Sequence, residues 1–260
     1  MATALHGYAV TLVRARVGGA CKNSLSAIGE GNSMRRLIAI PLVCIGALAL
    51  VTAAPARASG TLTVGMAISI GKHGCSLGFF GFNEDHDRLA VTAGHCADGV
   101  DWPVYSNNGV EIGIVVSHLP DNDDSRGIIR GARGYTLIQL YKSFDLDVFF
   151  TGLGSVTEGD WVTKYGKRSQ KTTGKVTNVK YVTDRADLDL IASTVVQLPG
   201  DSGCPWYTKG PTLVGMGSSG DQESGGGNEG SQAQPIGSVV DLIRQNSPRW
   251  GKRFKVWLTD

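Results

Sequence analysis

The strings Gly200-Asp201-Ser202-Gly203-Cys204-Pro205 and Thr92-Ala93-Gly94-His95-Cys96 lie about a hundred residues apart and determine how this chain is interpreted. A serine hydroxyl is a weak nucleophile at neutral pH and needs a neighbouring base, and histidine has a pKa suited to taking and returning a proton. A tight turn can also aim the N–H groups of Gly200 and Ser202 at one oxygen. A lone histidine or a lone Gly-x-Ser-Gly turn is ordinary, but together they predict a base, a nucleophile and an oxyanion hole.

The two strings resemble T-A-[AG]-H-C and G-D-S-G-G-P, the motifs of the trypsin/chymotrypsin serine peptidases, in particular the bacterial secreted type. Only Cys204 departs, because the family has glycine there. The resemblance implies two six-stranded antiparallel β-barrels (chymotrypsin-like), a cleft between them and a C-terminal helix. It places the first barrel at about 61–144 and the second at about 155–260. It also implies that Ser218 supports the catalytic residues and that the backbone of Gly220 pairs with substrate.

The residue pattern by itself predicts an all-β protein. Short segments rich in β-branched and aromatic residues alternate with turn residues, which is typical of a sandwich or barrel. The expected strands are 61–70, 89–92, 110–116, 135–140, 161–165, 174–182, 190–196 and 212–216, and 237–245 is the one expected helix.

The third catalytic residue departs from the family pattern. The family aspartate opens a strand of the form D-hydrophobic-x-L, and the matching string at 134–140 begins with Gly134. Asp147, Asp124, a water or nothing could take its place. Asp121, Asp123 and Asp124 form an acidic turn that could fold back toward the cleft, although a solvated turn is the commoner outcome. If only the aspartate is missing, Gly134→Asp should raise hydrolysis.

The resemblance gives Asp201 a different role, which is to order the oxyanion hole, and we expect an internal Arg or Lys as its partner. It also implies a disulfide between Cys75 and Cys96, with Cys204 free and buried. Disulfides are typical of exported proteins. No metal and no cofactor is expected, because His73, His86 and His118 form no paired ligand spacing with the cysteines.

The N-terminal residues predict export. Met34-Arg35-Arg36 is basic, 37–51 is apolar and Ala56-Arg57-Ala58 is an A-x-A cleavage site, so 34–58 reads as a signal peptide. A retained anchor is disfavoured, because a span needs about 20 apolar residues. The signal begins late, which makes 1–33 an untranslated or extra extension. The mature protein, residues 59–260, is expected to be secreted or extracytoplasmic.

Charge argues against nucleic-acid binding. The 260-residue chain has a net charge of +2, but residues 59–260 hold 19 Lys and Arg against 22 Asp and Glu, a net charge of −3. We therefore expect a peptide or protein substrate, no nucleic acid, no membrane after signal cleavage and a monomer. The basic cluster Lys164, Lys167, Arg168, Lys171 and Lys175 is expected to be a solvated strand face.

Two functions follow from these residues. The first is a secreted serine endopeptidase that forms an acyl-enzyme, and the alternative is a catalytically impaired homologue that binds peptides or an envelope protein. Val196, six residues before Ser202, gives no support to a demand for Arg or Lys in the substrate. Ser219 and Gly220 favour an open, uncharged pocket, and the glycine-rich run 217–230 is expected to be a loop beside it.

Overall fold

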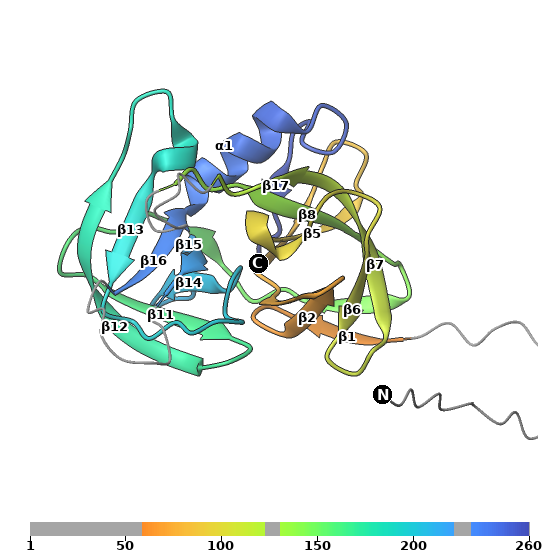
Figure 1. Ribbon diagram of the computed structural model, residues 1–260, viewed down its shortest axis with the longest axis horizontal. Coiled ribbons are helices and arrows are strands. Elements are labelled where there is room, and N and C mark those ends of the chain that lie inside the picture. The colour runs from red at the N-terminus through yellow and green to blue at the C-terminus, as the bar shows by residue number, and fades with distance from the viewer. Residues whose placement is uncertain (1–58, 123–130, 221–229, 260) are drawn as a thin grey trace, which may run out of the picture. The chain divides into compact units, whose positions relative to one another are not determined.

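The described part of the chain consists almost entirely of β-strands (Figure 1). The computed structural model describes residues 59–122, 131–220 and 230–259, which all belong to one compact unit. The expected extension 1–33 and signal peptide 34–58 lie outside these residues. The all-β prediction is confirmed.

The first half of this unit is an antiparallel sheet with the strand order β17-β4-β5-β8-β7-β6-β2-β3. Its strands are β2 (Ala67–Ile70), β3 (His73–Ser76), β4 (Phe79–Phe82), β5 (Arg88–Ala93), β6 (Pro103–Ser106), β7 (Glu111–Leu119), β8 (Tyr135–Leu140) and β17 (Lys255–Val256). A separate parallel pair joins β1 (Gly60–Thr63) to β9 (Phe144–Asp147). Strand β17 pairs with β4, so the last strand of the chain returns to the first sheet.

The second half closes into a six-stranded barrel. Its order is β15-β14-β11-β12-β13-β16, and β16 pairs again with β15. The strands are β11 (Trp161–Gly166), β12 (Gln170–Lys180), β13 (Leu190–Ser193), β14 (Pro205–Thr208), β15 (Thr212–Ser219) and β16 (Ser231–Pro235). The short strand β10 (Gly152–Leu153) lies outside the ring, parallel to β15.

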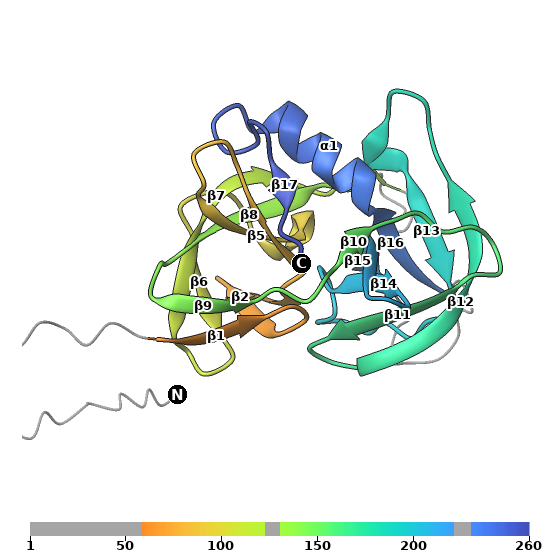
Figure 2. The ribbon, with the colours of Figure 1, turned by 180° about the vertical axis from the view of Figure 1, so that it is seen from behind.

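The expected helix is present as α1 (Ile236–Asn246), which contacts β8 of the first sheet as well as β15 and β16 of the barrel (Figure 2). A core cluster shared by both halves lies beside it. Phe79 and Leu89 come from the first sheet, Leu213 and Met216 from the barrel, and Val239 from the helix. Separate cores fill the first sheet and the barrel. The two halves are therefore held together by buried apolar surface.

The segment 61–70, expected as one strand, is two strands. A turn at 64–66 separates β1 from β2, and Gly65 there has φ +76°, a conformation that favours glycine. A side chain at this position would also overlap Tyr165, since a Cβ would lie 2.3 Å from its ring. The predicted strand was wrong because its alternating apolar pattern continues through the turn.

Candidate active site

His95 lies in a short 3₁₀ turn, η1 (Gly94–Cys96), directly after β5. Its Nδ1 is 2.5 Å from Oδ2 of Asp121, whose side chain is only 4% exposed. A carboxylate only accepts hydrogen bonds, so this contact places the ring proton on Nδ1 and leaves Nε2 free to accept a proton. The His118 ring also contacts this turn, with Nε2 2.8 Å from the carbonyl oxygen of Gly94.

Asp121 belongs to the acidic turn 121–124, for which the sequence allowed a return toward the cleft. The Gly134 N–H donates to Asp121 Oδ1 at 2.7 Å, so Gly134 contacts the carboxylate through its backbone. A Cβ on Gly134 would lie 1.8 Å from the carbonyl oxygen of Leu119. A Gly134→Asp side chain therefore has no room at this position, and the contact to His95 comes from Asp121 instead.

Among the described residues, Asp147 forms no ion pair or hydrogen bond with His95. Asp147 lies on β9, opposite Thr63, and is exposed. Asp123 and Asp124 fall outside the described residues. A signal for Asp121 existed in the sequence, as the acidic turn that could fold back, but nothing local distinguished Asp121 from its neighbours.

Ser202 lies in the turn between β13 and β14, and strands of both halves hold this turn. The N–H of Ser76 on β3 donates to the Ser202 carbonyl at 2.8 Å, and the N–H of Gly203 donates to Gly217 on β15 at 2.7 Å. Cys96, the residue after His95, has its Sγ 3.9 Å from the Ser202 carbonyl. These contacts bring the His95 and Ser202 segments together.

Glycines shape the turn around Ser202. Gly200 has φ +104° and Gly203 has φ +84°, both conformations that side chains resist. A Cβ on Gly203 would also lie 1.9 Å from the Thr92 hydroxyl oxygen, which itself donates to the Ser76 carbonyl at 2.8 Å. The turn therefore packs directly against the end of β5, and His95 follows in the next turn, η1.

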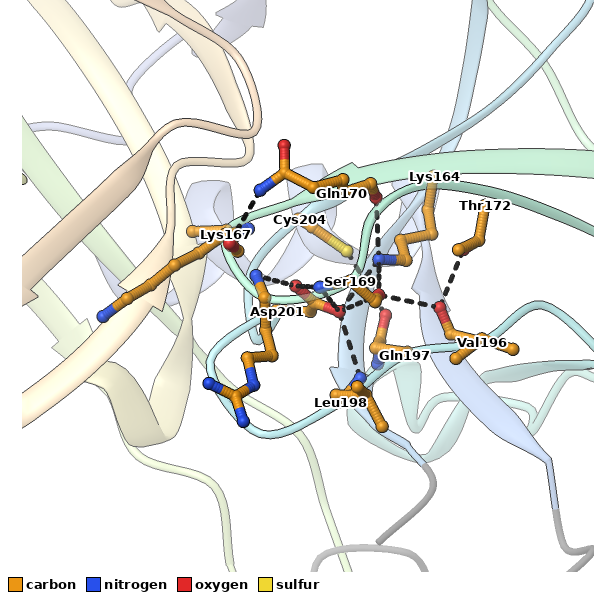
Figure 3. Close-up of polar contacts among 12 residues, drawn as sticks. Lys164, Lys167, Ser169, Gln170, Thr172, Val196, Gln197, Leu198, Asp201 and Cys204 are labelled. Atoms are coloured by element: carbon orange, nitrogen blue, oxygen red, sulfur yellow. Dashed lines mark hydrogen bonds and ion pairs between the residues drawn. The ribbon is translucent and has the colours of Figure 1, made fainter. Parts of the chain in front are cut away.

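Asp201 is buried and ion-paired with Lys164 at 2.8 Å, and both side chains are fully buried (Figure 3). The expected internal Arg or Lys partner is confirmed, and Lys164 is not part of a solvated face. Asp201 also accepts from the N–H groups of Arg168 at 2.6 Å and Leu198 at 3.0 Å. Burial alone would raise the pKa of Asp201, but the hydrogen bonds from Lys164, Ser169 and the backbone outweigh it and the pKa is lowered.

The cysteines are arranged as expected. Cys75 and Cys96 form a disulfide, and Cys204 is free and buried. Burial raises the pKa of the Cys204 thiol well above its usual value. Its Sγ lies 3.3 Å from Gln197 Oε1 and is accommodated because the facing residue on β15 is Gly217. The Cys204 N–H still donates to the Asp201 carbonyl at 2.9 Å, so the turn keeps its shape.

Arg133 lies behind the His95–Asp121 pair, and no pattern in the sequence drew attention to it. It is 3% exposed, and its Nε donates to Ser218 Oγ at 2.8 Å. Burial lowers the pKa of the Arg133 guanidinium, while the nearby Asp121 charge opposes this shift. Ser218, expected to support the catalytic residues, thus contacts Arg133. The guanidinium stays charged and joins β15 to the segment that carries Gly134.

The expected pocket residues lie at the end of β15. Gly220 packs against Gln197, since a Cβ on Gly220 would be 2.0 Å from the Gln197 carbonyl oxygen. Val196 is 44% exposed. Residues 217–219 of the expected glycine-rich loop form the end of β15, and 221–229 lie outside the described residues.

The described residues hold no group of three or more His, Cys, Asp or Glu side chains arranged to bind a metal ion. None of their helices is long and apolar enough to cross a membrane.

Comparisons with known proteins show both sequence relatives and structural neighbours of the chain. The chain is 33% identical to Streptogrisin-D of Streptomyces griseus over 165 residues, 58% of this chain and 40% of that protein. It is 31% identical to Serine protease 2 of Streptomyces fradiae over 165 residues, 58% of this chain and 91% of that protein. The structure resembles Thermobifida fusca Protease A with a TM-score of 0.55 and 19% identity, over 76% of this chain and 100% of that one. No family model matches the chain.

The fold, the two motifs and these relatives define the class: the chain belongs to the bacterial chymotrypsin-like serine proteases. It spans 40% of the length of Streptogrisin-D.

Proposed function

We propose that the protein is a secreted serine endopeptidase in which Ser202 attacks the peptide carbonyl, His95 is the general base and Asp121 orients His95. The observation that carries this proposal is the His95–Asp121 contact, 2.5 Å long and completed by the Gly134 N–H. A carboxylate in this place holds the histidine tautomer and stabilises the imidazolium that forms when Ser202 loses its proton.

The oxyanion hole in this proposal consists of the N–H groups of Gly200 and Ser202. Donors of this kind stabilise the negative charge that develops on the scissile carbonyl oxygen, and losing one typically costs about 10²–10³ in rate. The positive φ of Gly200 and the buried Asp201 support a turn that is fixed before substrate arrives. The acyl group would lie along residues 218–220, and the amine would leave first.

Gly134 and Cys204 depart from the family motifs and would favour a binding-only homologue. The structure around each of them is nevertheless compatible with a peptidase. Asp121 supplies a carboxylate where Gly134 cannot, and Cys204 fits beside Gly217 without disturbing the Asp201 backbone contact. We also infer that the sheet of the first half forms the other of the two barrels that the family fold implies, because its strands surround a core of their own. The Cys75–Cys96 disulfide supports export.

The test compares carboxylates. Asp121→Asn keeps the shape but removes the charge, so kcat should fall by about 10⁴. Asp147→Asn, an exposed carboxylate on β9, is the matched control and should leave kcat unchanged. The measurement is hydrolysis of a peptide p-nitroanilide together with labelling of Ser202 by a fluorophosphonate.

Ser202→Ala and His95→Ala should each abolish labelling, because the hydroxyl reacts only when a base takes its proton. Folded protein that neither labels nor hydrolyses would overturn the peptidase proposal and leave the binding-only alternative. Unchanged activity in Asp121→Asn would remove Asp121 from the mechanism.

A further inference from the structure

The Ser202 turn lies between strands β15 and β3, so a substrate bound at Ser202 has one strand on each side. Strand β15 holds the turn through Gly203, and strand β3 holds it through Ser76. Residues 218–220 of β15 are the proposed contacts for the part of the substrate before the scissile bond. The part after the scissile bond must therefore leave on the other side, along β3.

Two cationic residues, Lys167 and Arg168, line this leaving side. The Lys167 side chain runs from Gly200 to Gly74 on β3: its Cδ is 3.8 Å from where a Cβ on Gly200 would be, and its Nζ is 2.6 Å from the corresponding position on Gly74. The Cβ of Arg168 is 3.7 Å from the same position on Gly200. Both residues are exposed. In Figure 3 the Lys167 side chain points away from the buried Asp201 network.

Ser76 and Asp201, which contact the turn around Ser202, also hold the backbone of Lys167 and Arg168. The Lys167 N–H donates to Ser76 Oγ at 2.8 Å, and the same hydroxyl donates to the Gly200 carbonyl at 3.0 Å. The Arg168 N–H donates to Asp201. The backbone of both residues is therefore held in place before substrate binds.

The Lys167 ammonium is available to bind a ligand, because no neighbouring carboxylate is paired with it in the described residues. In the described part of the chain Lys167 forms no ion pair, and Gly74 has no side chain to cover it. The nearby carboxylate on this side, Asp98, is occupied by His73 at 3.0 Å and Lys72 at 3.6 Å. A negatively charged side chain of the substrate would meet a cation here, whereas a positively charged one would be repelled.

We propose that Lys167, with Arg168 beside it, makes the protein select an acidic residue directly after the scissile bond. This inference rests on the proposed peptidase function and adds its specificity on the leaving side. The attraction acts between exposed groups, so the preference is modest, about two- to fivefold, as expected for an exposed ion pair.

Transfer of the acyl group from Ser202 to added amines tests only the part of the site that binds the residue after the scissile bond. A peptide methyl ester acylates Ser202 without supplying any residue after the bond, and amino-acid amides then compete with water. The amine nitrogen forms a bond to the acyl carbon, the bond from that carbon to Ser202 Oγ breaks, and the amine proton passes through His95 to Ser202. Glutamic acid α-amide and glutamine amide differ almost only in charge. The first should capture about two- to fivefold more acyl group, and lysine amide less than either.

Lys167→Gln should abolish the difference between the two amides, and Arg168→Gln should reduce it. Lys209→Gln, an exposed cation on the β14–β15 turn, is the control and should keep it. Added salt should weaken the preference, since it screens exposed charges. Equal capture of both amides while the ester is hydrolysed would overturn the specificity alone. No ester hydrolysis and no fluorophosphonate labelling would overturn the peptidase function as well.

Discussion

At the residue scale, the family motif assigns one aspartate to the position of Gly134. In this chain Gly134 occupies that position, and Asp121 supplies the carboxylate that contacts His95. The carboxylate comes from Asp121, and the N–H of Gly134, thirteen residues later, fixes it. Gly94 completes the arrangement, since a Cβ there would be 2.4 Å from Asp121 Oδ1. The absence of side chains at these two glycines makes room for the displaced carboxylate.

Gly134→Ala should therefore destabilise the protein. The added methyl group meets the Leu119 carbonyl oxygen, which belongs to the backbone, and must displace it. Overpacking of this kind costs about 1–3 kcal/mol. Gly99→Ala, where nothing lies within 4 Å of the new Cβ, is the control. Urea unfolding measures both variants, and equal stabilities would refute the steric account. Labelling of Ser202 should also weaken in Gly134→Ala alone, because Asp121 moves.

The sequence predicted roles for His95, Ser202 and Gly200 because each is part of a short string whose residue order reflects local chemistry. Asp121 could not be identified in that way. Its contact depends on how β7 ends at Leu119 and on where β8 begins, and both depend on packing. Arg133 was missed for the same reason, since a buried arginine is recognisable only from its partners.

At the scale of elements, the β11–β12 hairpin matters most for the site. Lys164 on β11 reaches Asp201, and the turn after β11 supplies the N–H groups of Arg168 and Ser169 to the same carboxylate. The sequence anticipated the ion pair but interpreted all five basic residues as solvated. Alternation in β11 places Lys164 inward, with Thr163 and Tyr165 on the other face.

The lowered pKa of Asp201 makes the stability of this region depend on pH. An unfolded aspartate has a pKa of about 3.9, and the folded value is lower, so folding favours the carboxylate. This stabilisation is complete above about pH 4 and is lost as the pH falls through the folded pKa. Asp201→Asn leaves the Lys164 charge buried without its partner, which typically costs about 3–5 kcal/mol.

The measurement is the free energy of unfolding as a function of pH. The difference between wild type and Asp201→Asn should be constant near neutral pH and shrink below about pH 4, where the unfolded wild-type carboxyl binds a proton before the folded one does. Asp147→Asn should follow the wild type throughout. A difference between wild type and Asp201→Asn that stays constant down to pH 2 would contradict the assignment.

At the scale of the whole molecule, the shared core makes the two halves one folding unit. Phe254 is fully buried in the cluster that also contains Phe79 of the first sheet and Leu213 of the barrel. The sequence predicted the strand-rich class and the helix, because these depend on composition and periodicity. It did not predict β17, a two-residue strand defined only by its partner β4.

Phe254→Ala should therefore weaken both halves together. Removing this ring should cost about 3–5 kcal/mol. Far-UV circular dichroism and loss of Ser202 labelling should share one urea midpoint, as a two-state unit requires, and both should shift by the same amount in the variant. Leu153→Ala, a 47% exposed residue, serves as the control. Separate midpoints would show that the halves unfold independently.

The return of β17 to β4 has a consequence for timing during synthesis. The sheet that carries His95 and Asp121 receives its edge strand from residues 255–256, which the ribosome adds more than fifty residues after Ser202. A nascent chain that already contains all three groups still lacks this strand and Phe254. The sheet beside the proposed catalytic groups therefore becomes complete only after the groups themselves have been synthesised.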